Sequence, residues 1–241
     1  MIRSIKDDYS ALLMFIGDYS IKDTYDANFL DLVIKPMHRS YYSALVMCAE
    51  LQHQKIKPPM SLTSNHEEQE QLFWLHLSEC FSELGSSFFL VINGCYKASG
   101  QVLRSSIENF VKSIGGLDNI GINKIKNVYE VFERSSAAGF FSLEYGKEAF
   151  GGATKLYSEL CSTVHTGTPK DMQKISALGD FPVVDLDKAV YVKNIYTNIV
   201  TIYVSTLSVM FAEAFHKTHH TNRDIVQESL SPKALKLLHV A

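Results

Sequence analysis

The sequence predicts an all-α protein, a single-domain bundle of long antiparallel helices. Three observations lead to this prediction. Apolar residues recur at intervals of three and four through most of the 241 residues, which is the helical period. Alternation of apolar and polar residues, the pattern of a half-buried strand, is confined to short pieces such as FPVV. The composition, 46% hydrophobic and 20% charged, is that of a globular chain able to bury a sizeable core.

The first part of this domain, residues 1–64, is expected to hold helices joined by polar connections. An amphipathic helix is predicted over residues 3–17, and a helical segment over 28–34 is expected to stop before Pro36. Pro36 can open the next helix, because the first turn of a helix has no use for the N–H that proline lacks. The Pro58–Pro59 pair then marks the clearest break in the first half of the chain.

Residues 65–221 are expected to form the core of the bundle. Asn65 opens the longest helical region with the pattern of a capping box. Glycines interrupt this region, so two helices, or one kinked helix, are expected to meet between Asn93 and Gly100, and the second piece is expected to end at Gly115–Gly116. A helix is expected next over 123–134, followed by irregular structure or short turns over 135–152 and by a helix ending at His165. A long connection over 167–187 then leads to a long helix over 188–217, capped by Asp185 or Asp187. The chain ends in a C-terminal helical arm over 222–241, which is expected to pack on the body or on a partner.

The long helix near the C-terminus has to be weighed against a membrane span, because residues 195–215 contain no Lys or Arg. Small polar residues recur along it and fall on one face at 100° per residue. Such a stripe, with apolar residues on the other faces, is typical of a central bundle helix packed closely by its neighbours. The bundle interpretation is favoured, and no contact with a membrane is expected. The stripe consists of Asn194, Asn198, Thr201, Ser205, Ser208 and Ala212.

Composition and motifs give no support to several function classes. The formal net charge of −3 gives no global electrostatic reason to expect nucleic-acid binding, although a local basic patch is compatible with it. The four cysteines form no CxxC pair, which favours reduced thiols in a cytoplasmic protein. The N-terminus has no apolar signal core, so a secretory signal is not expected. P-loop, GxSxG, Rossmann and HExxH motifs are missing, and no cofactor is expected.

Three histidines in HKTHH are the nearest approach to a metal-binding pattern. His216, His219 and His220 can share a helix face, but no carboxylate or cysteine accompanies them closely. Cationic side chains near the end of a helix explain the pattern equally well. No metal site is predicted.

A polar stripe is predicted on the helix that contains Leu103. Arg104 and Glu108 lie one turn apart on it and can pair. One interpretation is a solvated face with a helix salt bridge worth a few tenths of a kcal/mol. The other is a phosphate site, since two flanking lysines leave the stripe net positive. The buried face is expected to be Leu103, Ile107, Phe110, Val111 and Ile114, and the polar sector Lys97, Gln101, Arg104, Glu108 and Lys112.

The stretch LYSELCSTVHTGT places a histidine where a helix ends. Leu156, Tyr157, Leu160 and Val164 fall on the core face of this helix. His165 lies on its flank, a position that suits proton transfer near neutral pH. Alternatively, His165 interacts with the free carbonyls at the end of its own helix.

The stretches VLRSSIENFVKSIGG and YSELCSTVHTGT resemble motifs of the HEPN superfamily, a group of small α-helical proteins. Many members are RNA-cleaving toxins or nucleases of bacterial immunity, and others are inactive nucleotide- or RNA-binding modules. The resemblance covers residues 66–216. The nuclease signature of the family places an arginine a few residues before the histidine, and residues 159–164 contain none. Arg104, on another helix, would have to supply that cation.

The resemblance implies an effector or toxin of a bacterial antiphage defence system that acts on RNA, by metal-independent cleavage or by binding. In the catalytic interpretation His165 is the general acid or base, Arg104 stabilises charge on the transition state, and Glu108 orients one of them. The resemblance also implies a homodimer whose paired sites face one cleft. The residues expected to contact the substrate are Lys97, Lys112, Tyr157 and Ser158.

The alternative function is that of a non-catalytic helical protein that binds a partner protein of the same defence system, or a nucleic acid, and regulates it. The missing local arginine favours this alternative, whereas the co-occurrence of Arg104, Glu108 and His165 favours the enzyme.

Overall fold

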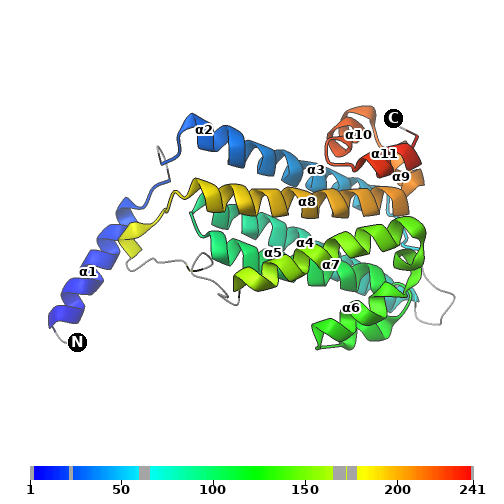
Figure 1. Ribbon diagram of the computed structural model, residues 1–241, viewed down its shortest axis with the longest axis horizontal. Coiled ribbons are helices and arrows are strands. Elements are labelled where there is room, and N and C mark those ends of the chain that lie inside the picture. Colours follow the sequence, from blue (N-terminus) through cyan, green and yellow to red (C-terminus); the bar gives the residue numbers. More distant parts are fainter. Residues whose placement is uncertain (1–2, 22–23, 60–65, 165–171, 173–177, 240–241) are drawn as a thin grey trace.

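The computed structural model confirms the all-α prediction (Figure 1). It describes residues 3–21, 24–59, 66–164, 172 and 178–239. The elements in chain order are α1 (Arg3–Asp18), α2 (Ala27–Phe29), the π-helical turn η1 (Leu30–Ile34), α3 (Lys35–His53), α4 (His66–Ile92), α5 (Tyr96–Gly115), the 3-10 turn η2 (Ile120–Lys124), α6 (Val128–Ser136), the 3-10 turn η3 (Gly139–Ser142), α7 (Glu144–Val164), the 3-10 turn η5 (Leu178–Asp180), α8 (Leu186–Met210), α9 (Ala212–Lys217), α10 (His220–Gln227) and α11 (Pro232–Leu237).

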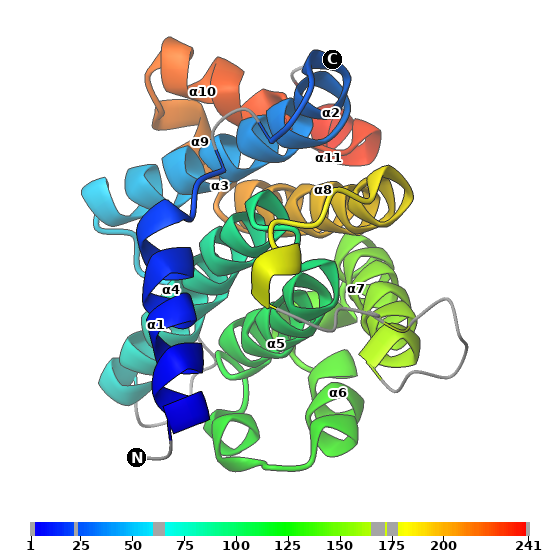
Figure 2. The same cartoon turned by 90° about the vertical axis from the view of Figure 1, so that its left-hand side faces the viewer.

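Five long helices run along the same axis and form the body of the bundle. Figure 1 shows α3 and α8 side by side, with α4, α5 and α7 beneath them. Viewed down that axis, α5 lies in the middle, between α4 and α7 (Figure 2). One hydrophobic core extends from Phe29 in α2 to Leu238 after α11, so the three parts distinguished in the sequence share a single interior.

The turn between α4 and α5 lies where the glycines predict it. α4 ends at Ile92 and α5 begins at Tyr96. Gly94 has φ +71°, the left-handed region that glycine enters without steric cost. It also lies directly against the backbone of Val183, so a Cβ atom at this position would overlap that backbone. The predicted end of α5 at Gly115–Gly116 is confirmed as well.

The predicted stop before Pro36 is wrong, because the chain stays helical from Ala27 to His53. Pro36 does lie in the first turn of α3, as expected. Proline has no N–H to bond the preceding turn, and residues 30–34 widen into a π-helical turn in which the Lys35 N–H bonds the Leu30 carbonyl.

Two further predictions need correction between α5 and α7. The helix placed at 123–134 begins only at Val128, because Ile125 is extended and the side chain of Asn127 caps α6 by accepting from the Tyr129 N–H at 3.0 Å. The irregular segment placed at 135–152 is helical from Glu144 onward.

The glycines of α7 explain the second error. A Cβ atom on Gly146 would overlap the Phe140 carbonyl, and one on Gly152 would come within 3.1 Å of Ile202 on α8. These glycines permit close packing and do not end the helix.

The predicted long helix is formed, with a break near its end. Asp185 caps α8 by accepting from the Lys188 N–H at 3.1 Å, as predicted. The break comes at Phe211, whose ring packs edge-on against Phe73, and α9 follows. Within the described ranges, none of the helices has the combination of length and apolar character needed to cross a membrane.

The polar stripe of α8 passes from the surface into the interior. Asn194 and Asn198 are exposed, whereas Ser205 and Ser208 are buried. The hydroxyl of Ser205 accepts from the Ser231 N–H at 2.8 Å, and that of Ser208 contacts the sulfur of Met47 at 3.6 Å. The small side chains of this half of the stripe therefore allow close packing by α3 and the C-terminal segment.

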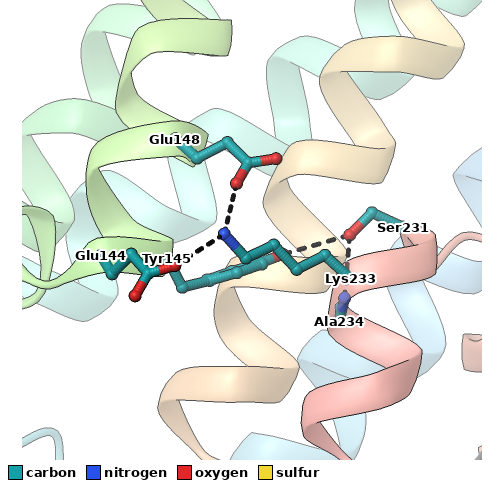
Figure 3. A network of polar contacts seen from close by, with 6 residues as sticks. All are labelled: Glu144, Tyr145, Glu148, Ser231, Lys233 and Ala234. Carbon is teal, nitrogen blue, oxygen red and sulfur yellow. Dashed lines mark hydrogen bonds and ion pairs between the residues drawn. The ribbon is translucent and has the colours of Figure 1, made fainter.

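The C-terminal arm packs on the body. Ser231 caps α11 by accepting from the Ala234 N–H at 3.2 Å, and its hydroxyl lies 3.3 Å from that of Tyr145 on α7. Lys233 reaches back to α7 and bridges two carboxylates, at 3.4 Å from Glu144 and 2.7 Å from Glu148 (Figure 3).

At the other end of the chain, α1 extends beyond the bundle (Figure 1). Several of its apolar side chains are exposed, Met14 and Ile16 by more than 60%. The connection after α1 is held by Tyr19, whose hydroxyl donates to the Asn93 side chain at 2.6 Å in the α4–α5 turn.

Candidate functional site

The middle helix α5 divides into the two faces that its sequence predicts. The five residues of the predicted buried face are at most 1% exposed. Lys97, Arg104, Glu108 and Lys112 are half-buried and Gln101 is exposed. Ser105 and Asn109, also half-buried, widen the polar stripe towards α4. The stripe lies between α4 on one side and α7 on the other.

Arg104, Glu108 and Tyr157 form one cluster on the α7 side of this stripe. The Nε atom of Arg104 lies 3.6 Å from Oε1 of Glu108. The hydroxyl of Tyr157 donates to the same carboxylate oxygen at 3.0 Å. The guanidinium of Arg104 lies over the Tyr157 ring, 5.7 Å from its centroid, within the range of a cation–π contact. The predicted pairing of Arg104 with Glu108 is confirmed, and the tyrosine joins it.

The packing of α7 places Tyr157 at this position. Leu156 and Leu160 point into the core, which leaves Tyr157 on the flank that faces α5. Its ring also packs against Phe132 of α6, with centroids 4.9 Å apart. Three helices therefore fix the ring, and its hydroxyl is aimed at Glu108.

The electrostatics of the cluster keep the tyrosine neutral. Burial, followed by the adjacent Glu108 carboxylate, raises the pKa of the Tyr157 phenol above its ordinary value. A neutral phenol keeps its proton and remains a hydrogen-bond donor. The side chains of Arg104 and Glu108 are 30% and 21% exposed, so both ions still reach solvent.

Arg104 keeps donors available for a ligand. Its ion pair with Glu108 uses Nε, and the two Nη groups have no hydrogen-bond partner among the described residues. A guanidinium edge of this kind can bind two oxygens of a phosphate at once. The cluster can therefore hold an anionic group, with Glu108 fixing the orientation of the guanidinium.

The other predicted site residues lie apart from this cluster or outside the described chain. Lys97 and Lys112 flank it along α5, and neither forms an ion pair with a described residue. Ser158 is exposed and donates to the Thr154 carbonyl of its own helix at 3.0 Å. His165 lies outside the described residues, so its predicted role stays a prediction.

A second polar cluster, on the α4 side of the stripe, was not predicted. Nδ1 of His76 lies 2.9 Å from Oδ1 of Asn109, and Nδ2 of Asn109 donates to Oε2 of Glu83 at 3.0 Å. The available signal was the placement of His76 and Glu83 two turns apart on the helix that precedes the stripe.

The environment shifts the titration of both ionisable groups in this second cluster. Burial, and to a smaller extent the nearby charge of Lys112, lowers the pKa of His76, although the Asn109 hydrogen bond and Glu79 act the other way. Burial raises the pKa of the Glu83 carboxyl, against hydrogen bonds from Ser105 and Asn109. Half-buried groups with shifted pKa values on one surface are a feature of functional sites, although structural clusters show it too.

The histidines near the C-terminus do not assemble into a metal centre in the described structure. No group of three or more His, Cys, Asp or Glu side chains there is arranged to hold a metal ion. His219 lines a surface hollow with Glu50, His53 and Lys217. Glu50 in that hollow is already engaged by the side chains of Gln54 and Asn222.

Comparison of the chain with protein-family models, with curated proteins and with solved structures found no match.

Proposed function

We propose that this chain is a HEPN-like effector or toxin of a bacterial defence system that acts on RNA through the polar stripe of α5. The observation that carries the proposal is the contact of Arg104 and Glu108 with Tyr157 at the surface of the bundle. These three residues come from the two stretches that resemble the family, and their arrangement leaves the guanidinium edge free for a phosphate.

The chemistry suits a phosphodiester. Negative charge grows on the phosphoryl oxygens when a phosphodiester is cleaved, and a preoriented guanidinium stabilises it. Lys97 and Lys112, half-buried on either side of Arg104, add positive charge along the same line. The charge of the Glu108 carboxylate is balanced by Arg104, and its Oε1 atom already accepts a hydrogen bond from Tyr157. The main role of Glu108 is therefore to position the arginine.

A growth experiment tests the proposal. The wild-type chain is expressed under conditions that trigger the system, and bacterial growth and RNA integrity are followed beside Arg104→Ala and His165→Ala. We expect the wild type to slow growth and fragment RNA, and Arg104→Ala to reduce cleavage by about 100-fold or more, the cost of removing one oriented donor to a developing anion.

Arg134 provides the matched control for this experiment. It pairs with Glu130 one turn away on α6, at 2.6 Å, and is more exposed than Arg104. Arg134→Ala therefore removes an equivalent helix ion pair without touching the stripe, and it should behave as wild type. Identical growth and intact RNA in all four strains would refute the proposal.

The second candidate function, a non-catalytic binding protein, is favoured by the absence of an arginine from residues 159–164. A binding protein would retain RNA without producing fragments. In that case its affinity should fall steeply with salt, and Arg104→Ala should lower the slope of log K against log salt by about one. A chain that binds a partner protein and no RNA would show neither effect.

The resemblance also leads us to propose that two copies of the chain associate. Light scattering of the purified protein measures this directly, because a dimer has twice the 27.1 kDa mass of the chain. A monomer at all concentrations would contradict this part of the proposal only.

A further inference from the structure

The His76 cluster holds its histidine in one tautomer. Nδ2 of Asn109 donates to the Glu83 carboxylate, so the amide must present its oxygen, Oδ1, to His76. An amide oxygen only accepts, and therefore Nδ1 of His76 carries the proton and donates it. In a neutral imidazole this leaves the lone pair on Nε2.

The Nε2 atom has no partner within the described structure. An unpartnered Nε2 is also not shielded from solvent, although the His76 residue as a whole is half-buried. Nε2 therefore reaches solvent, while the opposite edge of the ring is fixed by two successive hydrogen bonds. A histidine oriented through Nδ1 with an accessible Nε2 is arranged to accept a proton.

Burial keeps the ring in its neutral form, the form that can accept a proton, by lowering the pKa of His76 below its ordinary value. The ionisable groups that act on the ring are Lys112 on α5, which lowers this pKa further, and Glu79 on α4, which raises it, as does the hydrogen bond to Asn109. The ring is neutral at neutral pH for this reason. Lys112 supplies a cation beside it, as a phosphate would require.

The two clusters share the polar stripe of α5, one on its α7 side and the other on its α4 side. Glu108 and Asn109 are consecutive residues of α5, the first turned to Tyr157 of α7 and the second to His76 of α4. A ligand along the stripe would therefore meet the Arg104 guanidinium on one side and the imidazole on the other.

We propose that His76 is the general base of the RNA cleavage proposed above, an inference that rests on that function. Nε2 takes the proton of a ribose 2′-hydroxyl, and the 2′-oxygen attacks the adjacent phosphorus. The bond from phosphorus to the 5′-oxygen breaks, leaving a 2′,3′-cyclic phosphate, and the 5′-oxygen takes a proton from solvent. His76 then returns its proton to water. Asn109 and Glu83 are positioning residues that act through the ring.

The first test compares His76→Ala with His66→Ala in the full-length protein, using a short RNA with one cleavage site. His66 is an exposed histidine of the same helix, so its loss controls for the loss of an imidazole from α4. We expect His76→Ala to cleave at least about 100-fold more slowly, as for loss of a general base, and His66→Ala to match wild type. Added imidazole should partly restore His76→Ala, which a misfolded variant would not allow.

The outcomes separate this inference from the proposed function. If wild type cleaves RNA and His76→Ala cleaves at the same rate, the role of His76 is overturned and the proposed function stands. If wild type leaves RNA intact under triggering conditions, both fall. A slow His76→Ala variant that imidazole does not restore, with unchanged thermal unfolding, also overturns the role of His76 as a base.

The second test reads the positioning role from the pH profile of the cleavage rate. A general base must be neutral, so the rate should rise with pH through the pKa of His76. Asn109→Ala removes the hydrogen bond that raises this pKa and should move the rise to lower pH, with a slower maximum rate. Asn109→Asp keeps an acceptor and adds negative charge, so it should move the rise to higher pH. If the cleavage rate rises at the same pH in wild type and in both variants, the positioning role of Asn109 is overturned.

Discussion

The Glu108 carboxylate shows how one residue of the stripe is held from two helices. Arg104 approaches it from one turn earlier on α5, and Tyr157 donates to the same oxygen from α7. A hydrogen bond to an ionised acceptor contributes more than a neutral one, and the exposure of this cluster reduces that gain. The tyrosine hydroxyl therefore stabilises both the packing of α7 on α5 and the orientation of the arginine.

Replacing Tyr157 by Phe tests this contribution to stability. The ring contacts with Phe132 and Arg104 are retained, and only the hydrogen bond to Glu108 is lost. We expect the free energy of unfolding to fall by about 1 kcal/mol, measured by urea titration at neutral pH. Tyr129→Phe is the control, because that side chain is 82% exposed and its hydroxyl has no partner in the described structure, so its effect should be near zero.

Comparison of wild type with Tyr157→Phe also gives a pH test whose direction can be predicted. The folded-state pKa of Tyr157 is raised, so its contribution is complete below the unfolded value of about 10 and is lost as pH rises through the folded value. The difference in stability between wild type and Tyr157→Phe should therefore be constant from pH 7 to about 9 and shrink at higher pH. A difference that grows with pH would contradict the assignment.

Sequence separation decides which residue contacts could be predicted. Arg104 and Glu108 are one helical turn apart, so the periodicity of α5 is enough to pair them. The hydrogen bond from Tyr157 to Glu108 spans 49 residues and depends on the packing of α7 on α5, and that from His76 to Asn109 spans 33 and depends on the packing of α4 on α5. Spacing along one helix carries no information on such packing. For this reason Tyr157 and Glu108 were predicted only to belong to the same site, and the contact between His76 and Asn109 was not predicted at all.

At the scale of elements, glycines account for one success and one error of the helix predictions. Gly94 breaks the chain between α4 and α5 because it has positive φ, and the sequence predicts this turn. In α7, the Phe140 backbone comes too close to Gly146 for a Cβ atom, and Ile202 of α8 packs tightly against Gly152. A glycine looks the same in the sequence in both cases, so the second kind was misread as irregular structure.

Two glycine-to-alanine changes should have opposite effects. At Gly94, alanine has to adopt positive φ and meets the backbone of Val183, so Gly94→Ala should lower the free energy of unfolding by more than about 1 kcal/mol. At Gly151, within α7, a Cβ atom meets nothing within 4 Å. Gly151→Ala should raise stability by about 0.5–1 kcal/mol, the helix preference of alanine over glycine. Thermal and urea unfolding measure both, and equal signs would contradict this reading of the two positions.

At the scale of the whole molecule, the two ends of the chain differ in how they relate to the bundle. α1 extends beyond the body with apolar side chains exposed, whereas α10 and α11 return to cover α3 and α8. The C-terminal segment contributes Val226, Leu230, Ala234 and Leu238 to the core. It is further held by Ser231 and Lys233 against α7 (Figure 3). The arm predicted from the sequence is thus part of the folded body, and removing its apolar contacts should unfold more than the arm.

Adjacent leucines at the end of α11 test this integration. Leu238 is 1% exposed and Leu237 is 48% exposed, so the same substitution at neighbouring positions separates burial from any general effect on the C-terminus. Leu238→Ala should lower the free energy of unfolding by about 2–5 kcal/mol, because it removes buried methyl groups and leaves a cavity. Leu237→Ala should change it by less than about 0.5 kcal/mol. If the arm were only loosely attached, Leu238→Ala would leave global urea unfolding unchanged and would increase hydrogen exchange in α10 and α11 alone. A single cooperative transition, shifted for Leu238→Ala and unshifted for Leu237→Ala, is the result expected from one continuous core.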